Sequence, residues 1–171
     1  CAAEGMKQPN SQLVAVNSDT LDVLHDIQLP EPATSPHIVT VYQGRIAIYV
    51  AMNTMVQRAF WNPVTKKLSL DASWVIRPME KGQSAATAPS IIGDWVAVVT
   101  NGIGSETIAS SLVVASQKDA QNVKVIFPFG KELKKGEWSF APPKPGADPE
   151  NSMFYAADMG MRKVAGIKLD Q

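Results

Sequence analysis

Three methionines near the end of the chain are candidates for metal binding. Met153, Met159 and Met161 lie close together in the sequence, and Met159 and Met161 would share one face of an extended segment. Thioether sulfur is a soft ligand that suits Cu(I), so these residues form a candidate copper site. The alternative interpretation is that methionine fills irregular gaps in a core.

The two histidines offer little support for other metal or acid–base chemistry. His25 and His37 lie in unrelated contexts, without the spacing of a zinc site or a histidine-based triad. We expect His25 to face water at a strand edge. His37 directly follows Pro36, and we expect it to face the centre of the fold. The sequence therefore assigns no catalytic residue.

A lysine-containing segment near residue 130 is a candidate binding loop. Lys131, Lys134 and Lys135 precede a stretch rich in proline and glycine, which predicts a long loop over 130–149. Long loops often carry binding functions, and the alternative here is a solvated linker. The glycine-containing segment 102–106 lacks the lysine and the helix of a phosphate-binding loop, so we interpret it as an ordinary connection.

The single cysteine, Cys1, rules out an internal disulfide. Cys1 followed by small residues is typical of a lipid-modified bacterial lipoprotein after removal of its signal peptide, and the alternative is a cut made elsewhere. We therefore expect a periplasmic or secreted protein that is anchored through a lipid on Cys1. Sixteen basic residues balance 16 acidic ones, which gives no reason to expect nucleic acid as a partner. No apolar stretch approaches the roughly 18 residues that a membrane span needs.

The elements that must position these residues are predicted to be β-strands throughout. Twelve prolines and 11 glycines are spread along the chain, and short runs rich in valine, isoleucine and aromatic residues lie between turn residues. The predicted strands are 12–17, 22–29, 45–50, 55–61, 68–76, 95–100, 112–117, 123–129, 153–158 and 163–169.

An internal repeat predicts the architecture. Pro36, Pro89 and Pro142 lie at equal spacing, 53 residues apart, and similar strand runs follow each of them. A repeat of about 50 residues with three or four short strands is typical of a β-propeller blade. A β-sandwich is the alternative all-β fold. The repeat favours the propeller.

The strand count predicts about three blades, two of them complete, with partial blades at both ends. Closed propellers typically contain four to eight blades. We therefore expect the ring to be completed by the remaining blades of a longer chain or by a second copy. The predicted units are an N-terminal tail (1–11), a partial blade (12–35), a blade (36–88), a blade with the long loop (89–141) and a partial blade (142–171).

The repeat resembles that of quinoprotein-type propellers, a family that includes dehydrogenases dependent on pyrroloquinoline quinone. The segments 13–21 and 62–74 resemble that family's pattern of a strand followed by a turn that contains threonine. Leu21 and Lys66 stand where the family has glycine, and Trp74 is similar to its docking tryptophan, with Phe127 in that place in the next unit. The resemblance implies a quinone held with Ca²⁺ on the propeller axis, but no segment here aligns with such a site.

These observations lead to three hypotheses about function. The first is a non-catalytic propeller that serves as a scaffold or binding domain outside the cytoplasm and is incomplete alone. The second is a fragment of a quinone-dependent oxidoreductase. The third is a copper-handling protein that uses its methionines.

Overall fold

The computed structural model describes residues 11–34, 37–77, 80, 83–85, 88–102, 108–141 and 144–169. Cys1, Pro36 and Pro142, on which parts of the sequence analysis depend, lie outside this part of the chain. The described strands are all antiparallel and form four sheets. The chain is therefore all-β in these ranges, as the sequence predicts.

The first two sheets come from the N-terminal half of the chain. The first sheet pairs β1 (Gln12–Val16) with β2 (Val23–Gln28). The second sheet runs in the order β3 (Ile38–Tyr42), β4 (Arg45–Ala51), β5 (Val56–Asn62) and β6 (Lys67–Ile76).

The last two sheets come from the C-terminal half. The third sheet contains β8 (Ser90–Ile92), β9 (Trp95–Gly102), β10 (Ser111–Ser116) and β11 (Val123–Ile126), and the short β7 (Gln83–Ala85) also pairs with β9. The fourth sheet runs in the order β12 (Gly146–Asp148), β13 (Met153–Asp158) and β14 (Lys163–Lys168).

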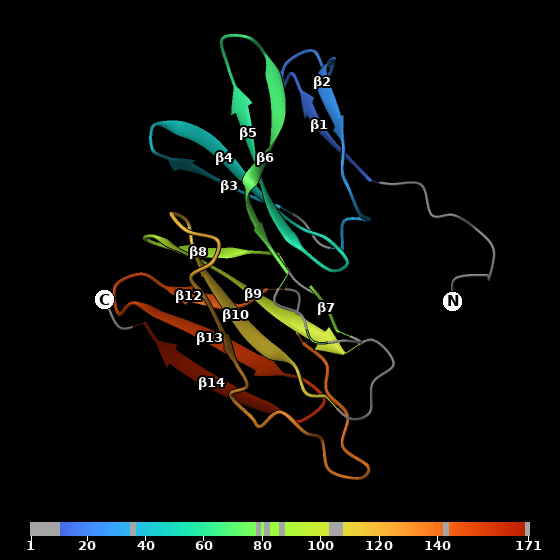
Figure 1. Ribbon diagram of the computed structural model, residues 1–171, viewed down its shortest axis with the longest axis vertical. Helices are drawn as coiled ribbons and strands as arrows, with labels where there is room; N and C mark the ends of the chain where they lie inside the picture. Colours follow the sequence, from blue (N-terminus) through green and yellow to red (C-terminus); the bar gives the residue numbers. More distant parts are fainter. Residues whose placement is uncertain are drawn as a thin grey trace, which may run out of the picture.

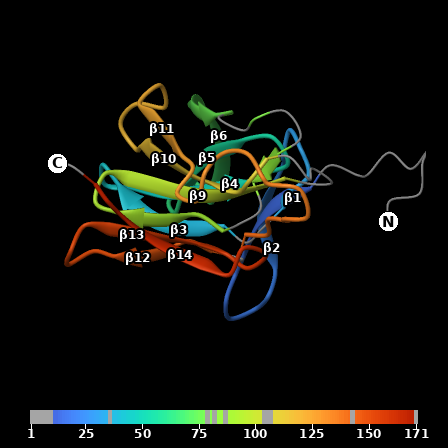
Figure 2. The same cartoon turned by 90° about the horizontal axis from the view of Figure 1, so that it is seen from below.

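The four sheets are stacked in chain order, with the first sheet at one end and the fourth at the other (Figure 1). Figure 2 looks along this stack from below, so that the sheets overlap one another. We call the face of each sheet that is turned toward the preceding sheet its front face, and the other its back face. Sheets stacked in this way by sequence order are propeller blades.

Three apolar cores lie between successive sheets, because alternate side chains of a strand point to opposite faces. Ala47 and Tyr49 on the back of the second sheet pack with Val96 and Val98 on the front of the third. The next core joins the third and fourth sheets. Leu13 of the first sheet packs with the front of the second sheet in the remaining core. Strands buried on both faces explain the nearly continuous apolar runs in the sequence.

Two of the strand-to-strand turns adopt the same geometry. In the β1–β2 turn the Asn17 side chain accepts hydrogen bonds from two following backbone N–H groups, and Asn62 does the same in the β5–β6 turn. Each turn ends on a residue with positive φ, Leu21 at 63° and Lys66 at 53°. These are the positions where the family resemblance expects glycine, and the left-handed backbone explains why glycine would suit them.

The second and third strands of each blade were predicted to within a residue or two, and β13 lies at its predicted bounds. The strands β3, β8 and β12, which precede β4, β9 and β13 and are here called the inner strands, were missed, and so was β7. Of these four, β7, β8 and β12 have only three residues each. One predicted strand was too long: β11 ends at Ile126, not at residue 129. There the chain enters a turn over residues 128 and 129, before the left-handed Gly130.

Candidate functional site: the cavity between the first and second sheets

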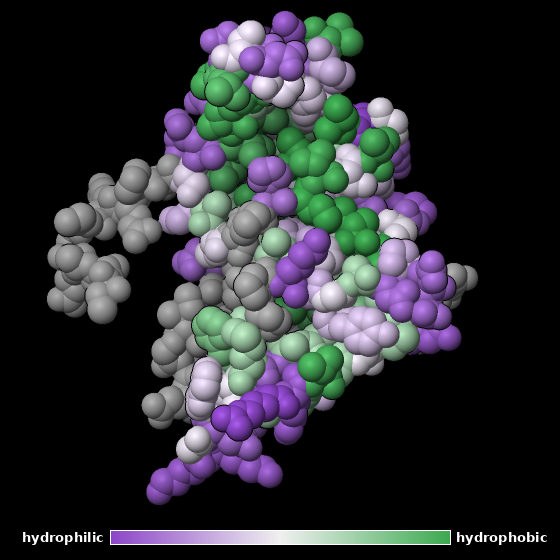
Figure 3. Space-filling view, turned by 180° about the vertical axis from the view of Figure 1, so that it is seen from behind, coloured by the Kyte–Doolittle hydropathy of each residue, from purple (hydrophilic) through white to green (hydrophobic). Residues whose placement is uncertain are grey.

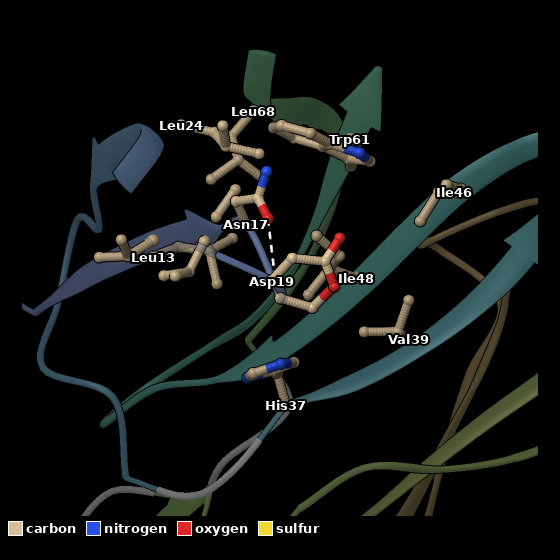
Figure 4. A pocket seen from close by; sticks show the side chains of 14 residues that line it. Leu13, Asn17, Asp19, Leu24, His37, Val39, Ile46, Ile48, Trp61 and Leu68 are labelled. Atoms are coloured by element: carbon tan, nitrogen blue, oxygen red, sulfur yellow. Dashed lines mark hydrogen bonds between the residues drawn. The ribbon is translucent and has the colours of Figure 1, made fainter. Parts of the chain in front are cut away.

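A cavity of about 470 Å³ lies between part of the first sheet and the front face of the second. β1 and the β1–β2 turn form one wall, and Val39, Ile46, Ile48 and Trp61 form the opposite wall (Figure 4). Val39, Ile46 and Ile48 line the cavity because these positions of β3 and β4 face the first sheet. The cavity therefore continues the core between the first two sheets toward the inner strands.

The cavity exists because the first sheet covers only the outer half of the second. β2 contacts β6, and Leu13 of β1 packs with Ala59 and Leu68. No described strand lies in front of β3, where Val39 is 52% exposed and Val41 is 70% exposed. In the space-filling view, green hydrophobic side chains gather on the upper part of the molecule, which holds the first two sheets (Figure 3).

Corresponding positions in the next two blades show what a covered front face looks like. β4 and β9 both follow a two-residue turn, so Ile46 corresponds to Val96; in the fourth sheet Phe154 occupies this place. Val96 is 1% exposed and Phe154 is fully buried, whereas Ile46 is partly exposed at the cavity. The front of the second sheet thus has the side chains of an interface between blades without a full covering.

Polar groups lie at one side of the cavity. His37, at the start of β3, is exposed, and Asp19 of the β1–β2 turn extends toward Ile48 and the cavity (Figure 4). The Asp19 backbone N–H donates to the Asn17 side chain at 2.8 Å, which fixes the turn that carries this carboxylate. Apolar walls with a few polar groups at one side are typical of a binding cavity.

His25 has a structural contact that the sequence did not predict. We expected this side chain to face water at a strand edge. Its Nδ1 instead accepts a hydrogen bond from the backbone N–H of Leu68 at 3.3 Å, which joins β2 to β6. The expectation was wrong because it considered the β1–β2 hairpin without the neighbouring blade.

The structure does not bring the three candidate methionines together. Met153 begins β13, whereas Met159 and Met161 lie in the turn that follows this strand. A six-residue strand separates its ends by about 17 Å at roughly 3.3 Å per residue, too far for one metal ion to bind both. Met159 is exposed and Met161 is partly buried, so only these two could share a ligand.

The three candidate lysines lie on the predicted loop between β11 and β12. Lys131 pairs with Glu80 at 2.7 Å and lies 5.5 Å from the centre of the Phe127 ring. Lys134 and Lys135 are exposed in a short turn that Glu137 closes. Phe127 is thus a partner of a surface lysine, unlike Trp74, which is buried and donates to the Ser116 carbonyl at 2.7 Å.

A buried polar network with a structural role joins the second and third sheets. Arg58 pairs with Asp71 at 2.8 Å and donates to the Gln117 backbone carbonyl at 2.7 Å. The Tyr49 hydroxyl donates to the Gln117 side chain at 2.8 Å. Burial of Tyr49 raises the pKa of its hydroxyl. All these polar groups are satisfied, so the network holds two blades together.

A second buried carboxylate, Asp158, joins the third and fourth sheets. It accepts hydrogen bonds from the Ser110 and Ser139 hydroxyls and from the backbone N–H of Met161. Burial raises the pKa of Asp158, but these hydrogen bonds and one from the Phe140 N–H outweigh it, so the net pKa lies below its ordinary value. The residue acts as an anchor for the turn that carries Met159.

Within the described ranges, no group of three or more histidine, cysteine, aspartate or glutamate residues is arranged to hold a metal ion. The same part of the chain contains no helix of the length and apolarity that a bilayer-spanning helix requires.

The fold matches that of a known β-propeller. No family model and no curated protein sequence matches this chain. Its structure is similar to the β-propeller domain of Cps50 (Swd1) from Myceliophteria thermophila, with a TM-score of 0.64 and 10% sequence identity. The similarity covers 95% of this chain and 49% of that one.

This similarity defines the class of the chain as a β-propeller. The chain spans about half the length of the Cps50 domain, and its four sheets correspond to complete and partial blades. The propeller part of the family resemblance is therefore confirmed, whereas the quinoprotein type is not shown. The prediction of two complete blades flanked by partial ones is also confirmed.

Proposed function

We propose that this chain is a non-catalytic β-propeller scaffold that acts outside the cytoplasm and binds the further blades that complete its ring. The observation that supports the proposal is the unequal covering of the second sheet. Its back face is packed against the third sheet, whereas Val39 and Val41 on its front face are exposed. Contiguous exposed apolar surface of this kind is typical of a binding interface.

The first test measures the solution mass of the purified chain over a range of concentrations by light scattering. We expect self-association, with masses above the 18.4 kDa of one chain, because the uncovered face binds apolar surface. Val41→Lys should increase the monomer fraction by placing a charge on that face. Val64→Lys is the matched control, since Val64 is 89% exposed in the β5–β6 turn.

Two outcomes would contradict the scaffold proposal. The first is a chain that stays monomeric at every concentration. The second is an equal effect of the two lysine substitutions. An absorbance titration with pyrroloquinoline quinone and Ca²⁺ separates the scaffold from a fragment of a quinone-dependent enzyme, because saturable binding would favour the enzyme.

The location is tested separately by mass spectrometry of the natural protein. We expect a lipid on Cys1, and an unmodified cysteine there would contradict an anchored form.

A further inference from the structure

The inner edge of β1 carries backbone groups that are positioned to pair with another strand. In antiparallel sheets, directly opposed residues alternate between hydrogen-bonded pairs and pairs whose backbone groups point outward. The Leu29 N–H donates to the Ser11 carbonyl at 2.8 Å, so the pair Ser11 and Leu29 is of the first kind. Val14 opposes Asp26. This pair lies three positions along the ladder from Ser11 and Leu29, so it belongs to the second kind. The N–H and carbonyl of Val14 thus point away from β2.

Among the described strands, β1 pairs with β2 alone. Its other edge borders the cavity, where Val14 and Val16 join Val39 and Ile48 in the lining. An edge with outward-pointing N–H and carbonyl groups and an adjacent apolar wall meets the requirements for strand addition, in which main-chain hydrogen bonds supply affinity and apolar pockets supply specificity.

The second and third sheets show which kind of element would pair with the open edge of β1. In the second sheet the hairpin β3–β4 precedes β5, and β4 pairs with β5 in antiparallel fashion. The same hairpin covers the front of the third sheet: Tyr42, Ala47 and Tyr49 pack with Val96 and Val98. β1 occupies the place of β5 in the first sheet, because it packs on the outer half of its neighbour and is joined by a turn of the same geometry to β2.

We propose that the β1 edge and the front face of β3–β4 together bind a β-hairpin whose apolar side chains alternate. One strand of this hairpin pairs with β1 in antiparallel fashion, and the other covers Val39 and Val41. This inference rests on the proposed scaffold function and specifies the structural element that the scaffold binds at β1. The occupant is a hairpin rather than the fourth sheet of a second copy, because that sheet already has three strands, and β1 and β2 would give the joint blade five. The second sheet is four strands wide, and so is the third, because β7 and β8 share one edge of β9.

The probe is a dye-labelled synthetic peptide of residues 37–51, the chain's own β3–β4 hairpin, and its binding is followed by fluorescence anisotropy. Val14→Pro removes an outward-pointing N–H while leaving the β1–β2 ladder intact, and we expect at least tenfold weaker binding. Val164→Pro is the matched control. The Leu169 N–H donates to the Ser152 carbonyl, so Val164, opposite Ala157, also has backbone groups that point outward. They lie on the edge of β14 that no described strand pairs with.

Val41→Lys provides a second variant that changes the face without touching the backbone of β1. We expect it to weaken binding of the peptide as well. Equal binding by wild type, Val14→Pro and Val164→Pro would overturn the inference. A loss confined to Val164→Pro would place the docking edge on β14 and would also overturn it.

The hairpin inference can fail while the scaffold proposal stands. No binding of the peptide by a wild-type chain that still self-associates through Val41 would overturn the hairpin alone. A chain that neither self-associates nor binds the peptide would overturn both.

Discussion

Replacing Arg58 by alanine should strongly destabilise the boundary between the second and third sheets. The guanidinium is buried, pairs with Asp71 at 2.8 Å, and donates to the Gln117 carbonyl at 2.7 Å. Its carbon atom Cζ also lies 4.5 Å from the centre of the Tyr42 ring. The substitution would leave the Asp71 carboxylate and the Gln117 carbonyl without this partner in a poorly hydrated place.

Removing one member of a buried ion pair costs about 3–5 kcal/mol, a large part of the roughly 5–15 kcal/mol that keeps a typical domain folded. The measurement is the free energy of unfolding in urea, followed by tryptophan fluorescence, because Trp74 is buried beside this network. Arg77→Ala is the control: Arg77 pairs with Glu31 at 3.0 Å but its side chain is 57% exposed, so the loss should be about 0–1 kcal/mol.

The double variant Arg58→Ala, Asp71→Ala separates the pair from other effects. Since the two residues are in contact, their individual costs should not add, and the coupling energy should exceed about 0.5 kcal/mol. The reasoning is refuted if Arg58→Ala costs no more than Arg77→Ala, because the network would then contribute little to the packing of these blades.

Three further predictions concern turns and the Asp158 anchor. Lys66→Gly should raise the free energy of unfolding by up to about 1 kcal/mol, because glycine removes the strain of a left-handed residue at φ 53°; a lower melting temperature would contradict this. Gly160→Ala should destabilise the chain by about 1–3 kcal/mol, since an added Cβ would clash with the Trp138 carbonyl oxygen; unchanged thermal unfolding would refute the contact. Asp158 has a lowered pKa in the folded chain, so its contribution is present above the unfolded pKa of about 4 and is lost as the pH falls through the lower folded value. Asp158→Asn should therefore lose about 1–3 kcal/mol at neutral pH and show a flatter decline in acid, and parallel pH profiles of unfolding would contradict this.

The sequence predicted the parts of the fold that are encoded in continuous apolar runs. Strands such as β9 and β10 are buried on both faces, so nearly every residue between Val96 and Val99 is apolar and the strand is evident. The inner strands carry a weaker signal. β12 contains Gly146, Ala147 and Asp148, and it is a strand only because β13 pairs with it.

The candidate site could be predicted only in part. The sequence predicts that His37 lines the central channel of the propeller; in the structure His37 lines the cavity between the first two sheets, which the sequence did not predict. The cavity itself had no sequence signal, because Val39 and Val41 look like any other strand residues until their covering is compared with that of Ile91 in the next blade. Pairing of His25 with Leu68 likewise depends on two hairpins that lie far apart in the sequence.

The stacking of the sheets in chain order has a consequence for how the molecule unfolds. Among the described residues, each sheet shares a core with its immediate neighbours alone, so the stability of the molecule resembles that of a linear array with nearest-neighbour coupling. In addition to their shared core, the second and third sheets are connected by hydrogen bonds of Arg58, Tyr49 and Trp74. Amide hydrogen exchange should therefore be slowest in β4, β5 and β10 and fastest in the two-stranded first sheet. A partner bound at β1 would slow exchange at the end of the array that opens most readily.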